Sequence, residues 1–282
     1  MRMKRKILFL LSLLLTAVTQ GTWAQTGIVN GSFSVSATKS VCFSHGNLQA
    51  TYDGSSWTWA FAANQWDYIG NATANNAING NGTVSANGTV DLFGWVGASN
   101  TTWTDAAMYG ISNSTLRNNT ATYGNKTNEA LKSDWGKIID PTGKTWRTLT
   151  NAEMTYVFNT RSSGSTVWNT ANARYTFATI NTDDTGVNGI ILFPDGITVE
   201  ESEVSTAGTV NAASSWGTQC TAAQWAALEA KGCVFLPAAG YRSGASFTSG
   251  NHGCYWTSNA HASNTNDAFR LYFLANQINL GA

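Results

Sequence analysis

The sequence predicts an α+β fold in which a twisted, mostly antiparallel sheet carries two short helices and long loops. Three observations support this class: short apolar segments with strand-like patterns recur along the chain, only two segments carry helix start signals, and long polar stretches lie between them. Helices are too few for a doubly wound parallel sheet, in which strands and helices alternate. The length suits one large domain or two small ones, and no proline-rich or charged linker divides the chain.

The first 24 residues have the pattern of a secretory signal peptide. A basic start over residues 1–6 precedes an apolar run over residues 7–18, and Ala24 is a small residue at the expected cleavage point. The apolar run is shorter than the roughly 18–20 residues that cross a bilayer, although an uncleaved N-terminal anchor is an alternative. We therefore expect a protein that is secreted or held in the cell envelope, with no membrane span after signal cleavage.

Strands are expected early in the mature chain. Val41-Cys42-Phe43 is one apolar segment, and in the next Trp57, Trp59 and Phe61 alternate as the side chains on one face of a strand do. Residues 71–89 are rich in Asn, Gly, Ala and Thr and contain no aromatic residue. This composition is typical of a low-complexity surface loop.

Two helices are expected, each beginning with a capping box. Residues 150–153 (Thr-Asn-Ala-Glu) begin a helix that extends to about Asn159, and residues 221–224 (Thr-Ala-Ala-Gln) begin one that extends to about Ala230. Gly232 ends the second helix. The side chains expected to point into the core are Met154, Val157, Phe158, Trp225 and Leu228.

Further strands follow the first helix. Residues 175–180 and 187–193 form two of them, and Asn188-Gly189 at the start of the second is typical of a turn. The later strands are residues 233–236, 254–257 and 268–273.

The charge of the chain argues against nucleic acid as the main partner. The 282 residues include 16 Lys and Arg and 16 Asp and Glu, and only 11% are charged. Four basic residues lie in the predicted leader, so the mature chain has 16 − 4 = 12 basic groups against 16 acidic groups. Phosphate neutralisation requires a basic footprint, which a net charge near 12 − 16 = −4 does not supply.

Cysteine and acidic residues give little support for a cofactor. The four cysteines are Cys42, Cys220, Cys233 and Cys254. They allow three disulfide pairings in an exported chain, and unpaired buried thiols are an equally open alternative. No Cys-x-x-Cys pair supports a zinc site. Asp183 and Asp184 offer oxygen ligands for calcium, but an ordinary polar turn is the better explanation of them, so we expect no cofactor.

Several motifs resemble a family of secreted proteins when taken in order. They are FSHGNLQ (43–49), NQWDY (64–68), DLFGW (91–95), WRTLT (146–150), GIILFPD (189–195), FLPAAGYR (235–242) and YWTS (255–258). The series resembles C-type-lectin-like secreted proteins of gut Bacteroidetes, which are akin to the Fibrobacter succinogenes major paralogous domain and more distantly to the formylglycine-generating enzyme (sulfatase-modifying factor) fold. The match covers nearly all of the mature chain.

The resemblance implies a single C-type-lectin-like domain over residues 25–282, in which two helices flank a small twisted sheet and long loops carry the binding surface. Such domains usually continue with a Gly-Phe-Ser-Val-Arg-like strand, whereas this sequence stops after residues 277–282. The C-terminal strand is therefore expected to be missing, or the sequence is truncated. An uncovered sheet edge would follow.

Catalysis is not expected. The sequence has no nucleophile elbow, zinc-protease helix, phosphate loop or dinucleotide fingerprint. The formylglycine-generating branch of the resemblance uses two closely spaced cysteines, whereas the nearest pair, Cys220 and Cys233, is separated by a predicted helix. His252 and His261 share a polar segment, but no acidic partner is placed by spacing for proton transfer.

The region from Tyr241 to Tyr272 is the candidate binding surface. It alternates aromatic strands with loops rich in Asn, Ser, Thr and His, a combination of rigid contact area and adaptable hydrogen bonding. The alternative is that these polar residues only keep a low-charge surface soluble. The expected surface contributors are Tyr241, Arg242, Asn251, His252, Tyr255, Asn259, His261, Asn264, Asn266 and Arg270. The residues assigned to the core are Trp256, Phe269, Leu271 and Phe273.

These expectations describe an exported receptor or adhesin-like module that binds a protein or glycan. The resemblance adds that, in relatives diversified by retroelements, the C-terminal part of the domain carries the variable ligand surface. The alternatives are a secreted enzyme related to formylglycine-generating enzymes and a structural component of the cell envelope.

Overall fold

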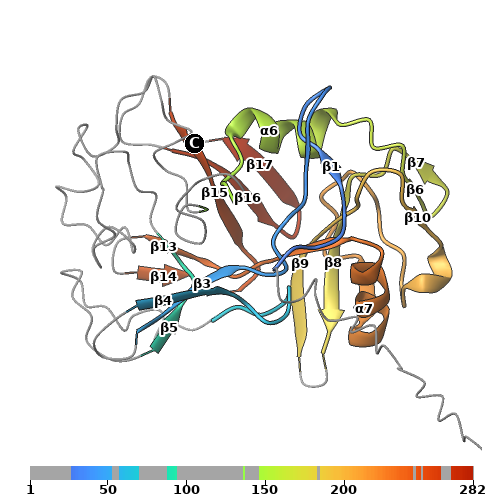
Figure 1. The fold of residues 1–282 in the computed structure, drawn as a ribbon. Helices are drawn as coiled ribbons and strands as arrows, with labels where there is room; N and C mark the ends of the chain where they lie inside the picture. Colours follow the sequence, from blue (N-terminus) through green and yellow to red (C-terminus); the bar gives the residue numbers. More distant parts are fainter. Residues whose placement is uncertain are drawn as a thin grey trace, which may run out of the picture.

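The computed structural model describes residues 27–52, 57–69, 88–93, 136, 146–182, 185–243, 246–248, 250–261 and 268–281. The predicted leader, most of the predicted loop at 71–89, and Asp183 and Asp184 lie outside these residues. Within them the fold is α+β, built mostly of strands with two short α-helices (Figure 1).

The largest sheet, which we call the central sheet, has four strands in the order β11-β8-β9-β12. Its strands are β8 (Tyr175–Asn181), β9 (Gly186–Leu192), β11 (Thr218–Thr221) and β12 (Val234–Pro237). Strand β11 runs parallel to β8, and the other neighbours are antiparallel. Three of these strands agree with the predicted segments, whereas β11 is a strand that the sequence patterns did not predict.

Smaller sheets surround the central sheet (Figure 1). The C-terminal sheet has the order β15 (Gly253–Ala260), β16 (Ala268–Leu274), β17 (Gln277–Gly281). Two others have the orders β4 (Trp57–Phe61), β3 (Leu48–Tyr52), β5 (Gly88–Val90), and β10 (Thr198–Val199), β6 (Thr166–Val167), β7 (Thr170–Ala171). The two-stranded pairs are β1 (Phe33–Ser34) with β2 (Ser40–Val41), and β13 (Tyr241–Ser243) with β14 (Ser246–Thr248). Among the described strands only β11–β8 and β10–β6 pair in parallel, which confirms mostly antiparallel pairing.

Both predicted helices form with the predicted caps. Helix α6 (Asn151–Thr155) continues as a π-helical turn, η2 (Tyr156–Thr160), and α7 spans Ala222–Ala230. The Thr150 and Thr221 side chains accept hydrogen bonds from the backbone three residues on, and both capping boxes are complete. The five side chains expected to point inward are all buried. A short 3-10 turn, η3 (Glu201–Glu203), follows strand β10.

Hydrophobic cores lie on both faces of the central sheet. One is shared with α7 and includes Ile180 and Trp225. The other is shared with α6, η2 and the C-terminal sheet and includes Phe158, Phe177 and Phe273. Strand β9 is covered on both faces, which explains the unbroken apolar run with which it ends.

Asn188-Gly189, which the sequence predicted to be a turn, lies inside strand β9. Gly189 faces Pro237 in β12, and a Cβ atom on Gly189 would lie 2.4 Å from the carbonyl oxygen of Leu236 and 2.5 Å from the Phe235 ring. The glycine therefore permits a close approach of two strands rather than a turn. The chain reverses earlier, where Thr182 N and Oγ1 both bind the carbonyl oxygen of Thr185.

The end of the described chain forms a strand that the sequence patterns did not predict. Residues Gln277–Gly281 form strand β17, which pairs with β16 along its whole length. Ile278 and Leu280 pack partly buried against the second core. Within the described residues, β17 is thus the edge strand of the C-terminal sheet.

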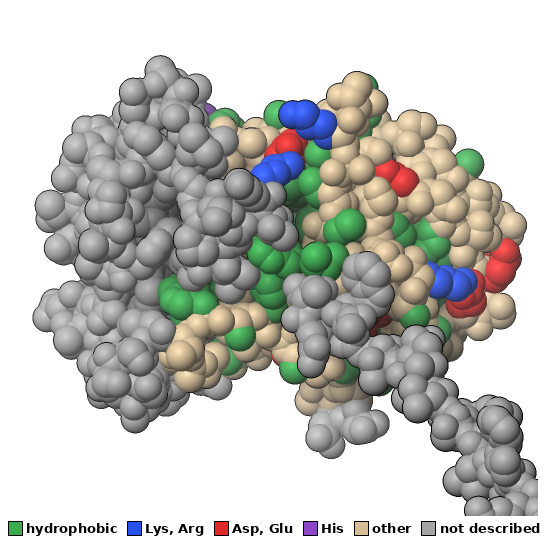
Figure 2. Space-filling model, in the orientation of Figure 1, with side chains coloured by type: hydrophobic (Ala, Val, Ile, Leu, Met, Phe, Trp, Pro, Cys, Tyr) green, Lys and Arg blue, Asp and Glu red, His purple; other side chains and the backbone are tan. Residues whose placement is uncertain are grey.

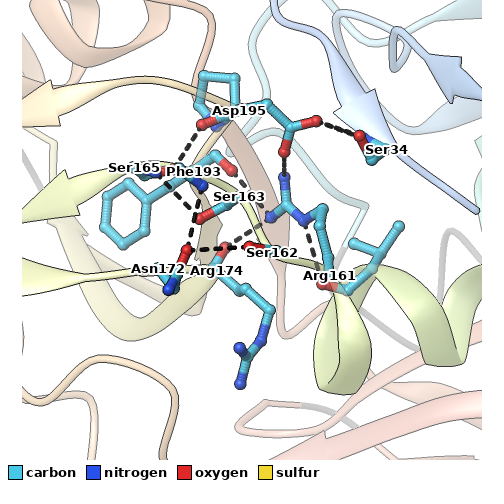
Figure 3. A network of polar contacts seen from close by, with 12 residues as sticks. Ser34, Arg161, Ser162, Ser163, Ser165, Asn172, Arg174, Phe193 and Asp195 are labelled. Carbon is cyan, nitrogen blue, oxygen red and sulfur yellow. Dashed lines mark hydrogen bonds and ion pairs between the residues drawn. The ribbon is translucent and has the colours of Figure 1, made fainter. Parts of the chain in front are cut away.

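A buried arginine joins segments that are distant in the sequence (Figure 3). Arg161 directly follows η2, its side chain is fully buried, and its Nη1 lies 2.7 Å from Asp195 Oδ1. Its Nη2 donates to the carbonyl oxygens of Phe193 (2.9 Å) and Arg174 (3.3 Å), and its guanidinium lies over the Phe33 ring. All these partners accept or stabilise positive charge, so the burial of the guanidinium is compensated.

The same aspartate holds the N-terminal hairpin. Asp195 Oδ2 accepts hydrogen bonds from the backbone N and the hydroxyl of Ser34, at 2.7 and 2.6 Å. Asp195 N also donates to the carbonyl oxygen of Ser32. Arg161 and Asp195 thus connect the end of the first helix, the end of β9 and strand β1.

A second buried side chain, Gln65, connects the N-terminal region to β12. It is 1% exposed, its Nε2 donates to Glu229 Oε1 (2.7 Å), and its Oε1 accepts from Phe235 N (2.6 Å). His45 also reaches Glu229, with Nδ1 3.4 Å from the carboxylate. The segment before β5 is therefore held against α7 and the central sheet.

All four cysteines lie in the described chain and are free thiols. Cys42 is exposed, Cys220 and Cys233 are buried, and Cys254 is half-buried. Burial raises the pKa of Cys220 to about 12, and burial likewise raises the pKa of Cys233. Of the two alternatives left open by the sequence, the structure shows free thiols.

We expect Arg161→Met to lower the free energy of unfolding by about 3–5 kcal/mol, because it leaves the carboxylate of Asp195 without its buried cation. Urea unfolding followed by tryptophan fluorescence measures the loss. The matched control is Arg147→Met, which removes an arginine paired with Glu153 at the surface and should cost about 1 kcal/mol or less. Similar losses for the two variants would contradict a special role for the buried pair.

We expect iodoacetamide at about pH 8 to alkylate Cys42 rapidly in the native protein, and Cys220 and Cys233 only after unfolding. Buried thiols with a raised pKa contain little of the reactive thiolate. Peptide mass spectrometry assigns the adducts, and Cys42→Ser should abolish the rapid reaction. If Cys220 and Cys233 resisted alkylation in denaturant until a reductant was added, they would be a disulfide and the expectation would be wrong.

Candidate functional site

The C-terminal sheet presents two chemically different faces. In the β15–β16 register Cys254 faces Tyr272 and Trp256 faces Arg270, and these four side chains share what we call the outer face. The opposite face contributes Leu271 to the second core. Leu271 and Phe273, which the sequence assigned to the core, are fully buried, whereas Arg270 and Tyr272 are only half-buried.

Gly253 determines which residues of β15 point into the core. It lies opposite Phe273, and a Cβ atom at this position would lie 2.0 Å from the Phe273 ring. The ring therefore occupies the space over the glycine, which no other residue type could leave open. This contact fixes the register that places Cys254 and Trp256 on the outer face.

Three rings gather on the outer face. The ring of Tyr272 lies 5.9 Å from that of His252 and 6.4 Å from that of Tyr241, and the His252 and Tyr241 rings lie 5.7 Å apart. The chain brings them together through a parallel bridge between Ala239 and His252 and a 2.7 Å hydrogen bond from Gly240 N to the His252 carbonyl. With Arg270 they form what we call the outer-face cluster: Tyr241, His252, Arg270 and Tyr272.

Arg270 is the cation of this cluster. Its guanidinium carbon lies 5.7 Å from the centre of the Tyr272 ring, a distance at which a cation is attracted to the ring face. Within the described residues no carboxylate lies within ion-pair distance of it. Burial, followed by the neighbouring Tyr241, raises the pKa of Tyr272, so the phenol stays protonated at neutral pH.

Cys254 lies beneath the cluster, opposite Tyr272. Burial raises the pKa of its thiol to about 11, an effect that the charge of Arg270 opposes. The thiol is therefore protonated at neutral pH and behaves as a small apolar group.

Tyr255 lies on the other side of the sheet from the cluster. Its ring stacks on Phe273, at 6.1 Å between centres, and its hydroxyl donates to the carbonyl oxygen of Pro237 at 2.8 Å. Burial raises the pKa of this hydroxyl. The expectation that Tyr255 belongs to the surface is corrected accordingly. Trp256, assigned to the core, is half-buried on the outer face, where its Nε1 donates to the Phe93 carbonyl oxygen.

Asn259 has a structural partner. Its Oδ1 accepts a 2.7 Å hydrogen bond from the backbone N of Asn151, the first residue of α6. A neighbouring hydrogen bond joins Ser258 N to the carbonyl oxygen of Leu149. Asn259 thereby fixes the start of α6 to strand β15, satisfying one of the backbone donors that a helix N-terminus leaves unpaired.

The other predicted residues are dispersed. Asn251 is exposed, has a positive φ of 58°, and accepts a hydrogen bond from Asn188. His261 is half-buried, with its ring 5.1 Å from that of Phe269, which is itself half-buried rather than in the core. For Arg242 the structure describes the backbone, which pairs with Phe247. Asn264 and Asn266 lie outside the described residues.

The structure thus brings Tyr241, His252 and Arg270 of the predicted set together and adds Tyr272. That residue bounded the predicted region but was not named as a contributor. The signal for it was present, since period-two alternation already placed Tyr272 on the same side of its strand as Arg270.

Within the described residues, no three His, Cys, Asp or Glu side chains are grouped so that they could hold a metal ion. None of the described helices has the length and apolar character that crossing a membrane requires. Comparisons of the chain with protein-family models, curated proteins and solved structures found no match.

We expect Asn259→Ala to lower the free energy of unfolding by about 1–2 kcal/mol, because the N–H of Asn151 loses its acceptor. Thermal and urea unfolding measure the effect. Asn159→Ala is the matched control, since Asn159 is exposed in η2, and it should change stability by about 0.5 kcal/mol or less. A loss no larger at Asn259 than at Asn159 would show that the contact contributes nothing.

Proposed function

We propose that the protein is an exported ligand-binding module that contacts a protein or a glycan through the outer-face cluster. The observation that carries the proposal is the cluster itself: three rings and an arginine without an acidic partner among the described residues, all of them half-buried. Tyr, His and Arg side chains on a rigid support provide contact area and hydrogen bonds at little entropic cost.

The composition supports the same proposal. On the face shown in Figure 2, the described surface carries few charged side chains and consists mainly of other side chains, backbone and hydrophobic side chains. The low share of charged residues, 11% of the chain, agrees with this view. Such a surface gives an approaching ligand hydrogen-bonding partners without strong competition from neighbouring charges.

Export and fold class belong to the proposal as well. The predicted leader supports a location outside the cytoplasm, either secreted or in the cell envelope. The C-type-lectin-like fold is supported by two short helices beside small sheets and by the ordered series of motifs that resembles that family.

We expect the double variant Tyr241→Ala/Tyr272→Ala to weaken ligand binding by at least about tenfold, since aromatic anchors dominate such surfaces. The purified protein is first tested against immobilised neutral and acidic polysaccharides and extracellular-matrix proteins, and any ligand that binds is then titrated against each variant.

The matched control is Thr170→Ala, an exposed position in β7 of another sheet, which should bind as the unmodified protein does. Thermal unfolding establishes that each variant is folded. Unchanged binding of every ligand by the double variant, or no binding across the whole panel, would overturn the proposal.

A further inference from the structure

The outer-face cluster contains a positively charged group and no negatively charged one. Arg270 is its only permanently charged group, and His252 is the only other member with nitrogen atoms in its side chain. Elsewhere in the described chain Arg147, Arg161 and Lys231 each pair with a carboxylate. The half-buried guanidinium of Arg270, by contrast, has no hydrogen-bond acceptor or ion-pair partner in the described residues. It lies over the Tyr272 ring instead.

An arginine in this state is suited to bind an anion. The ring contact orients the planar guanidinium but uses none of its five N–H donors. Because the group is only half-buried, water binds its donors until a ligand supplies acceptors in place of that water. The guanidinium fork matches a carboxylate, which it binds through two parallel hydrogen bonds.

The rings around Arg270 indicate which class of molecule bears the anionic group. Tyr241, His252 and Tyr272 offer ring surface together with polar hydroxyl and imidazole groups. A sugar ring has an apolar C–H face and hydroxyl groups at its rim, so it can use both parts of such amphipathic side chains. Exposed Asn251 lies beside His252 and provides a further amide. A peptide anchor would instead require a desolvated apolar pocket, and the outer face presents polar rings.

We propose that the outer-face cluster binds an acidic glycan, with Arg270 paired to the carboxylate of a uronic acid residue and Tyr241 and Tyr272 packed against the sugar ring. This inference rests on the proposed function, because it takes the cluster to be the binding surface. It adds the chemical class of the ligand and requires no metal ion.

The test compares two ligands that share one sugar backbone and differ in whether their carboxyl groups are ionised or methyl-esterified. Isothermal titration is performed with tri-galacturonic acid and with its fully methyl-esterified form, in buffer containing a chelator. The acid is expected to bind at least about tenfold more tightly than the ester, because only the acid offers an ionised acceptor to Arg270. Raising NaCl from about 50 mM to about 500 mM should weaken binding of the acid and leave the ester unchanged.

Variants assign this preference to one residue. Arg270→Gln is expected to remove the preference for the acid, while Arg270→Lys keeps part of it as a point charge without the fork. The matched control is Lys39→Gln, which removes one positive charge from an exposed position between β1 and β2 and should leave both affinities unchanged. Equal losses for Arg270→Gln and Lys39→Gln would mean that net charge, and not the cluster, controls binding.

Each outcome separates this inference from the proposed function. Equal binding of acid and ester, lost together in Tyr241→Ala/Tyr272→Ala, would keep the binding surface and overturn the acidic ligand. No binding of either sugar would overturn the inference, while the proposed function would still be decided by the wider panel. Hexaglutamate that binds as tightly as the acid, with the same dependence on Arg270, would show an acidic peptide ligand and also overturn the inference.

Discussion

The buried guanidinium of Arg161 is the constraint on which the arrangement of the whole fold depends. A charge that water cannot reach must be paired and hydrogen-bonded within the protein. The guanidinium has Asp195, two backbone carbonyl oxygens and the Phe33 ring as partners. These partners belong to the end of β9, the segment before β8 and strand β1. Satisfying one side chain therefore places the first helix, the central sheet and the N-terminal hairpin relative to one another.

The cores determine where a binding surface can exist. Because the central sheet is covered on both faces, its side chains are committed to packing. The C-terminal sheet uses one face for the second core and leaves polar and aromatic side chains on the other. The contact of Gly253 with Phe273 fixes this division, since a shift of one residue would exchange the two faces. Packing in the interior thus positions Arg270 and Tyr272 outside.

Local signals made much of this architecture predictable. Both helices begin at capping boxes, whose hydrogen bonds join residues three apart, and the alternation of β16 separates Leu271 from Tyr272 within a single strand. Predictions were wrong where contacts between residues distant in the sequence determine the structure. Gly189 sits in a strand because Phe235 approaches it. In β15 both faces carry an aromatic residue, Tyr255 or Trp256, so alternation defined two faces without showing which one packs inward.

The hydrogen bond from Ser34 to Asp195 joins residues 161 positions apart, and that from Phe235 to Gln65 spans 170. During synthesis, β1 and Gln65 are complete long before Asp195 and Phe235, their hydrogen-bond partners, have been added to the chain. Strand β1 and Gln65 consequently spend most of translation without these partners. Contacts of such separation also slow the search for the native state. The architecture thus favours folding after the chain is finished, which keeps it unfolded, and open to chaperones, for longer than a fold built from neighbouring segments.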